Sequence, residues 1–150
     1  ILSFSQEVSL ETVFSDKISI RAIELYDHKI WYSGTDSKFG FVDINNPQNQ
    51  KQIKLSEKKL QFRTLAQDKN SFYAINIESP AEFFKINKKD LTSEIIFKDT
   101  AKTAFYDALH FVNNDLAFTF SDADKDKSQI ILNLLFLKTE NGIASRILLF

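Results

Sequence analysis

Two arginines and one aspartate are the residues of this chain most able to act together, because they recur at a nearly constant spacing. Arg21 and Arg63 lie 42 positions apart (63 − 21), and Asp107 follows 44 positions later (107 − 63). An aliphatic residue stands two positions after each of them, which predicts equivalent places on three similar strands. Guanidinium groups bind carboxylates through paired hydrogen bonds. We therefore interpret the three residues as a binding site for a protein partner, or alternatively as ion pairs between neighbouring units, Arg63 with Asp107 for example.

The other residue types that perform chemistry do not form a recognisable set. The chain has no cysteine and only 3 glycines, which excludes thiolate catalysis, cysteine-based zinc sites and a glycine-rich cofactor loop. His28 and His110 have no neighbours in a triad or metal-binding pattern. Asp122, Asp124 and Asp126 have the spacing of a calcium loop but lack the glycine and glutamate that complete it. The sequence thus predicts no catalytic residues, no metal and no cofactor.

The elements that would position the candidate residues come from three stretches of similar sequence, residues 20–44, 61–87 and 105–122. Each reads as short strands of alternating apolar and polar residues, with Asn, Asp, Gly and Pro at the turns. Trp31 corresponds to Tyr73, and Phe41 to Phe83, at one offset of 42 (73 − 31 and 83 − 41). Because large aromatic residues recur in register, we expect Trp31 and Tyr73 to pack in a core.

A repeat of about 42 to 44 residues with several strands is the period of a β-propeller, in which four-stranded blades surround a central channel. We therefore expect one all-β domain over residues 1–150, a partial ring of about three four-stranded antiparallel blades at residues 18–55, 60–98 and 104–139. The first strand of each blade would line the channel, which places Arg21, Arg63 and Asp107 at its mouth. Rings usually need about four to eight blades. We therefore expect the N-terminal part of a longer propeller, a homodimer that completes the ring through open sheet edges, or an open β array.

Charge and hydropathy exclude several classes of partner. With 19 basic and 20 acidic side chains the net charge is −1, so no surface for nucleic acid is predicted. Lys69 and Lys88 stand beside acidic residues and are expected to be solvated. No run approaches the roughly 20 apolar residues that cross a bilayer, which predicts no membrane insertion. The opening ILSFSQ resembles the end of a cleaved signal peptide, which predicts a periplasmic or secreted protein; an ordinary first strand is the alternative.

Taken in order, several motifs of the chain resemble one propeller family, the bacterial BNR-like proteins related to photosystem II stability or assembly factors. The matching residues are Arg21 and Arg63, residues 31–34 (WYSG), residues 79–81 (SPA) with Lys85, residues 105–108 (FYDA) and residues 121–122 (SD). The resemblance covers roughly residues 19–122 and implies a β-propeller. Members of the family are often labelled oxidoreductases without a demonstrated reaction, and the Asp-box turn typical of them is absent here.

Two classes of function follow from these observations. The first is a non-enzymatic β-propeller scaffold for protein–protein interaction, with its partner at the channel mouth. The second is an enzyme at the central channel, either a glycosidase or sialidase-like hydrolase, or a redox protein as the family label implies. The missing Asp-boxes and the absence of a cofactor motif favour the scaffold.

Overall fold

The structure is a computed structural model that describes residues 15, 17–78, 80–99, 104–112, 115–123 and 130–138. Side chains are described for residues 15, 17–78 and 80–98. Within these ranges the regular elements are all β-strands, and each paired strand is antiparallel to its neighbours. The predicted all-β class with antiparallel sheets is therefore confirmed for the described part of the chain.

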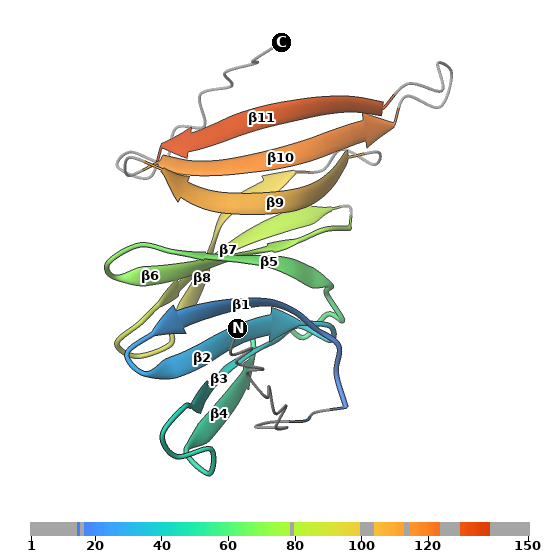
Figure 1. Ribbon diagram of the computed structural model, residues 1–150. Coiled ribbons are helices and arrows are strands. Elements are labelled where there is room, and N and C mark those ends of the chain that lie inside the picture. The colour runs from blue at the N-terminus through green and yellow to red at the C-terminus, as the bar shows by residue number, and fades with distance from the viewer. Residues whose placement is uncertain are drawn as a thin grey trace, which may run out of the picture.

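The strands form three sheets, and Figure 1 shows sheet 2 between sheets 1 and 3. Within each sheet the strands pair in chain order as a meander. Sheet 1 contains β1 (Ile20–Tyr26), β2 (Lys29–Gly34), β3 (Lys38–Asp43) and β4 (Gln50–Lys54). Sheet 2 contains β5 (Phe62–Gln67), β6 (Ser71–Asn76), β7 (Ala81–Asn87) and β8 (Ser93–Asp99). Sheet 3 contains β9 (Ala104–Val112), β10 (Asp115–Ala123) and β11 (Ile130–Lys138).

In sheet 3, β9 has the bounds that the sequence predicts, whereas β10 and β11 extend further than expected. The charged stretch 121–127 is expected to be a loop, but β10 runs to Ala123 and pairs with β11 up to that residue. β11 also continues without a break through residues 136–138, although the sequence pattern there also fits a separate outer strand. Each residue of β10 has a partner in β11, so strand pairing outweighs the local polarity from which the loop was predicted.

Sheets 1 and 2 share one register in their first hairpins. Ile23 pairs with Tyr32, and Leu65 pairs with Ala74, so both partners shift by the same 42 positions (65 − 23 and 74 − 32). Side chains on a strand alternate between two faces, so a shared register assigns corresponding residues to corresponding faces. Each side chain of the first hairpin in sheet 1 can therefore be compared directly with its counterpart in sheet 2.

The second hairpins differ in length, and this corrects one predicted correspondence. Ser33 pairs with Phe39, six positions on (39 − 33), whereas its counterpart Ile75 pairs with Phe83, eight positions on (83 − 75). The counterpart of Phe83 is therefore Phe39, and the predicted match of Phe83 with Phe41 is wrong. A single offset along the sequence fails wherever a connection is longer in one unit than in the other.

Among the described side chains, a hydrophobic core lies between sheets 1 and 2. The ring centroid of Phe72 on β6 is 4.6 Å from that of Trp31 and 5.5 Å from that of Phe39. Trp31 and Tyr73 are 5% and 1% exposed, so their predicted place in a core is confirmed. β9 contacts β5, β6 and β7, so sheet 2 has other strands against both of its faces.

Ser37, in the turn between β2 and β3, holds the connection that leads from sheet 1 to sheet 2. Its side chain is fully buried and its backbone has a positive φ of 59°. The hydroxyl donates to the carbonyl of Lys58 and accepts from the N–H of Leu60 at 2.9 Å. The Ser37 N–H donates to the Leu60 carbonyl, and the N–H of Leu55 donates to the Ser37 carbonyl, both at 2.9 Å. Through these four hydrogen bonds Ser37 pairs with backbone N–H and C=O groups of a connection that has no regular secondary structure. The same bonds hold the segment that leads into β5.

Candidate functional site

The two arginines predicted to form the site occupy equivalent irregularities of neighbouring sheets. The pairing of β1 with β2 shifts register at Arg21, and the pairing of β5 with β6 shifts at Arg63. Each arginine is the extra residue of a β-bulge, a device that re-aims a side chain and is frequent beside functional sites. β9 has a corresponding shift, where Asp107 and Ala108 lie opposite the single residue Thr119 of β10.

The side chains of Arg21 and Arg63 are exposed. The ion pairs among the described side chains all have lysine as their cation, so neither arginine is paired there. The side chain of Asp107 lies outside the described residues, so the predicted alternative of an ion pair with Arg63 stays a prediction. Guanidinium groups without an ion-pair partner among the described side chains can donate hydrogen bonds to a carboxylate brought by another molecule.

The first strands of the three sheets, which carry these bulges, are neighbours in space. β1 contacts β5, and β5 contacts β9, although each strand belongs to a different sheet. In Figure 1 the three strands follow one another through the middle of the stack. The predicted site residues therefore lie on successive neighbouring strands, as their spacing in the sequence suggests.

A second polar cluster joins sheets 1 and 2 at the opposite ends of β1 and β5. Lys88, just after β7, places its Nζ 3.7 Å from the ring centroid of Tyr26. This ammonium donates to Gln67 Oε1 at 2.7 Å and to the Asp68 carbonyl at 2.6 Å. Gln67 in turn donates from Nε2 to Glu24 Oε2 of sheet 1 at 2.8 Å. The prediction that Lys88 is solvated is wrong, because the aromatic ring of Tyr26 from another sheet covers it. The sequence around Lys88 gives no sign of this contact.

Burial changes the acidity of two groups in this cluster. Desolvation lowers the pKa of Lys88 below its ordinary value of 10.5, although the carboxylates of Asp68 and Glu24 favour the charged form. Desolvation raises the pKa of Tyr73, and the hydrogen bond from its hydroxyl to Asp68 Oδ2 at 2.8 Å raises it further. Gln67 and Lys88 contact Glu24 and Tyr26 of sheet 1, so we assign these two residues to the contact between sheets 1 and 2. Tyr73 follows Phe72 on β6 and therefore points to the opposite face of sheet 2.

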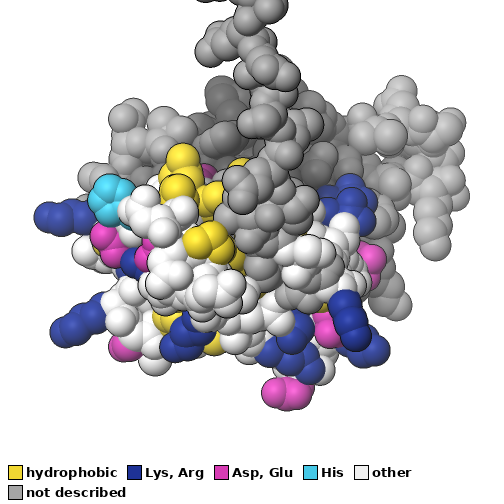
Figure 2. Space-filling model, turned by 60° about the horizontal axis from the view of Figure 1, so that its bottom comes forward, with side chains coloured by type: hydrophobic (Ala, Val, Ile, Leu, Met, Phe, Trp, Pro, Cys, Tyr) yellow, Lys and Arg dark blue, Asp and Glu magenta, His cyan; other side chains and the backbone are white. Residues whose placement is uncertain are grey.

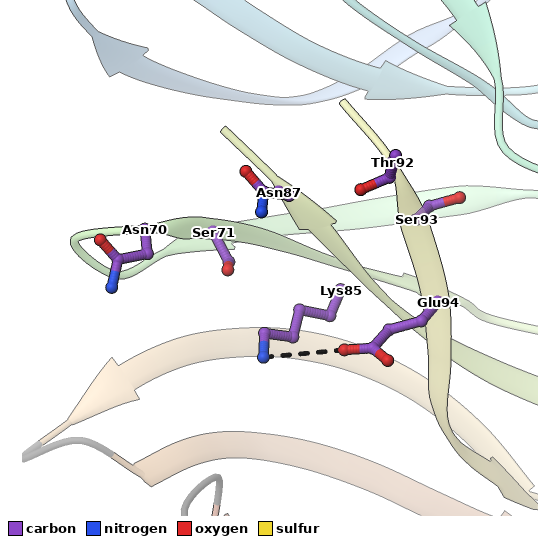
Figure 3. A pocket seen from close by; sticks show the side chains of 7 residues that line it. All are labelled: Asn70, Ser71, Lys85, Asn87, Thr92, Ser93 and Glu94. Carbon is purple, nitrogen blue, oxygen red and sulfur yellow. Dashed lines mark ion pairs between the residues drawn. The ribbon is translucent and has the colours of Figure 1, made fainter. Parts of the chain in front are cut away.

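An open polar cavity of about 380 Å³ lies on sheet 2 (Figure 3). The described residues that line it all have polar or charged side chains: Asn70, Ser71, Lys85, Asn87, Thr92, Ser93 and Glu94. Figure 3 shows Lys85 and Glu94 reaching toward each other from β7 and β8, with 3.7 Å between Nζ and Oε1. Apart from Lys85, which belongs to a motif of the resemblance, these residues look like ordinary turn and strand-end residues in the sequence, so no pattern pointed to the cavity.

The groups around this cavity are arranged for structure, and no acid–base pair for catalysis stands out. The N–H and hydroxyl of Thr92 both donate to Asp90 Oδ1, at 3.0 and 2.7 Å. Asn87 Oδ1 accepts from the N–H of Lys89 at 2.8 Å. These bonds close the turn between β7 and β8, which is the usual task of Asn, Asp and Thr side chains there. Among the described lining residues Glu94 is the single carboxylate, and it faces a lysine.

The remaining candidates from the sequence are dispersed. His28 lies in the turn between β1 and β2 with a φ of 56°, and His110 lies in β9. Asp122 is part of β10, whereas Asp124 and Asp126 are outside the described residues. Within the described ranges, no three His, Cys, Asp or Glu side chains come together as metal ligands. The same ranges contain no helix with the length and apolarity to span a membrane.

A scan against protein-family models finds no match to this chain, and a search among curated proteins finds none. The resemblance to the BNR-like propeller proteins therefore stays a prediction from the sequence.

Proposed function

We propose that the chain belongs to a β-propeller and acts as a non-enzymatic scaffold that binds a protein partner outside the cytoplasm. In this proposal each sheet is one blade, and β1, β5 and β9 are the strands nearest the central channel. Arg21, Arg63 and Asp107 then stand at one mouth of the channel and contact the partner.

One observation carries the proposal: Arg21 and Arg63 are exposed at the same bulge position of two strands that contact each other. A bulge holds the backbone in a fixed local bend, so both guanidinium groups start from a defined geometry. Guanidinium groups arranged in this way suit the carboxylates of Asp and Glu side chains or of a chain terminus. An acidic segment of another protein is therefore the ligand that this site fits best.

The experiment uses fluorescein-labelled acidic hexapeptides, with fluorescence polarisation measured at about 50 mM and about 200 mM salt. We expect the peptides to bind the wild-type chain more weakly at the higher salt, because exposed charges are screened. The double substitution Arg21→Ala with Arg63→Ala should weaken binding at least about tenfold, the usual cost of losing a charge-assisted pair.

The matched control removes two exposed cations elsewhere, with Lys51→Ala and Lys59→Ala. This control changes the net charge by the same amount as the arginine variant. A similar loss of peptide affinity in both variants would mean that overall charge attracts the peptide and that the two arginines do not form a specific binding site. Retained binding in the arginine variant, with the circular dichroism of the folded chain, would also refute the assignment.

A further inference from the structure

The polar cavity on sheet 2 lies at a place where sheet 1 has a packed aromatic ring. Two rows of paired residues correspond, Trp31–Phe41–Lys51 across sheet 1 and Tyr73–Lys85–Glu94 across sheet 2. In sheet 1 the middle residue is Phe41, whose ring centroid is 4.8 Å from that of Trp31. In sheet 2 the middle residue is Lys85, which lines a cavity of about 380 Å³. The cavity therefore depends on the side chains of sheet 2 and not on the strand pairing that both sheets share.

Lys85 and Glu94 form a loose ion pair in the wall of this cavity. Lys85 Nζ is 3.7 Å from Glu94 Oε1, which is longer than the roughly 2.7 to 3.2 Å of a hydrogen bond. Neither side chain makes a hydrogen bond to any described residue, and they are 38% and 65% exposed. Exposed ion pairs contribute little to stability, so both charges can turn to a ligand at small cost.

The two charges favour a ligand that carries both signs. A simple anion would meet the repulsion of Glu94, and a simple cation would meet that of Lys85. The rest of the molecule offers no strong field for either ion, because its net charge is −1 and Figure 2 shows basic and acidic side chains interspersed around the sheet 1 end. A molecule with an ammonium and a carboxylate close together can place each group against its opposite charge.

We infer that the cavity binds a small zwitterion, a free α-amino acid, with its carboxylate on Lys85 and its ammonium on Glu94. Figure 3 shows the carboxamides of Asn70 and Asn87 around the same space, from the turn before β6 and from the end of β7. They offer further hydrogen bonds to a carboxylate or an ammonium. The volume of about 380 Å³ is near the lower end of the roughly 300 to 1,000 Å³ typical of small-molecule sites, which suits one amino acid better than a peptide.

The test follows the backbone amide signals of the isotope-labelled full chain by NMR during titration with glycine, L-alanine, L-serine or L-leucine. We expect saturable shifts at Ser71, Lys85 and Glu94, with a dissociation constant on the order of 1 mM for so open a site. N-acetyl-L-alanine lacks the ammonium and L-alanine methyl ester lacks the carboxylate. Each should bind at least about tenfold more weakly than L-alanine, the usual cost of losing a charge-assisted bond.

Substitutions in the pair separate contact with the ligand from a structural role. Lys85→Gln should abolish the preference for L-alanine over its methyl ester, and Glu94→Gln the preference over N-acetyl-L-alanine, because each variant lacks the charge that reads the altered group. The matched controls are Lys54→Gln and Glu57→Gln, which remove the two charges of another exposed pair with 3.4 Å between Nζ and Oε2. Both controls should bind L-alanine like the wild type.

Three results would overturn the inference. They are the absence of shifts with all four amino acids, equal binding of L-alanine and its two derivatives, and shifts at the cavity with D-glucose or inorganic phosphate but not with the amino acids. Persistent preferences in both variants of the pair would also contradict it. The site shares no residue with the arginine site, so L-alanine should not compete with the acidic hexapeptide, and either proposal can fail while the other stands.

Discussion

β1 and β5 occupy the same place in their sheets and differ in what surrounds them. Both begin a four-stranded meander, both carry a bulge at an arginine, and their registers differ by a constant 42 positions. Nevertheless most of β1 is exposed and most of β5 is buried. This comparison shows that the local sequence determines where a strand forms and which residues lie on each face. The burial of those residues is determined by the sheet that packs against each face.

The comparison of sheets 1 and 2 extends to the residues that directly follow β3 and β7. The N–H of Ile44 donates to the His28 carbonyl, and the N–H of Lys88 donates to the Asn70 carbonyl, both at 2.9 Å, which makes Ile44 and Lys88 counterparts. Ile44 is 48% exposed, whereas Lys88 reaches onto Tyr26 of the preceding sheet. At this position, as in the first strand, the residue of sheet 2 has a neighbour that its counterpart in sheet 1 lacks among the described side chains.

The largest expected effect is the difference in stability loss between alanine substitutions at Phe72 and at its counterpart Ile30 (72 − 42). Phe72 is fully buried and its ring contacts Trp31, Phe39 and Tyr26. Phe72→Ala should lower the free energy of unfolding by about 3 to 5 kcal/mol, because it removes a buried ring and leaves a cavity. Ile30→Ala should cost about 1 kcal/mol, because Ile30 is only partly buried and water can fill the space. Urea unfolding at about 1 μM protein, followed by the fluorescence of the single tryptophan, measures both.

Equal costs for the two substitutions would contradict the comparison. They would mean that Ile30 is as tightly packed in sheet 1 as Phe72 is in the contact between sheets 1 and 2. A control with Phe97→Ala, a partly buried ring on β8 that contacts Phe83 at 5.1 Å, should fall between the two values.

The sequence alone predicts the strands because their signals are local. Alternation of apolar and polar residues marks most strands of sheets 1 and 2, and the recurrence of Trp31 and Tyr73 correctly indicates a core. The positions of Arg21 and Arg63 on equivalent strands were also predictable, since they follow from spacing. That each arginine forms a bulge was not, because a bulge is a property of two paired strands.

Features that depend on distant partners escaped prediction for physical reasons. The correspondence of Phe83 with Phe39 depends on the length of a connection, which a constant offset ignores. Lys88 looks solvated among its charged neighbours, and only the ring of Tyr26, 62 positions away (88 − 26), makes it part of a contact. The buried Glu82 likewise depends on lysines from two other segments.

A moderate effect is expected at Glu82, where a carboxylate that is 3% exposed lies in sheet 2 and its counterpart in sheet 1 is Lys38 (82 − 44). Glu82 Oε1 is 3.0 Å from Lys98 Nζ and 3.2 Å from Lys58 Nζ. Burial alone would raise its pKa, but the two ammonium groups outweigh burial and hold the pKa below 4.5. Glu82→Gln should therefore lower the free energy of unfolding at pH 7 by about 2 kcal/mol, the order of a hydrogen bond to a charged group.

The pH dependence at Glu82 has a definite sign. A carboxyl whose pKa is lower in the folded state stabilises the fold at pH values above about 4.5, and this contribution is lost as the pH falls through the folded pKa. The difference between the wild type and Glu82→Gln should thus shrink between about pH 5 and pH 3. A difference that stays constant over this range would show that Glu82 contributes through packing and that its charge contributes little. Glu57→Gln, at a fully exposed carboxylate, should change neither stability nor its pH dependence.

The smallest expected effect tests the contact that Lys88 makes across the two sheets. Lys88→Met keeps the apolar stem but removes the ammonium, with its bonds to Gln67 and Asp68 and its place over the ring of Tyr26. Its removal also relieves the desolvation that lowers the pKa of Lys88, so we expect a net loss of only about 1 kcal/mol. Ile44→Met, at the exposed counterpart, should stay within about 0.5 kcal/mol of the wild type.

A double-mutant cycle decides whether the ring contributes to this contact. If the ammonium interacts with Tyr26, Lys88→Met and Tyr26→Leu together should cost less than the sum of the two single substitutions by at least about 0.5 kcal/mol. Strict additivity would assign the effect of Lys88 to its contacts within sheet 2, which are the two hydrogen bonds and the ring of Phe72, whose centroid is 4.8 Å from Nζ. Lys88 would then stabilise only sheet 2. A neighbour across the interface would no longer explain why Lys88 differs from its counterpart Ile44.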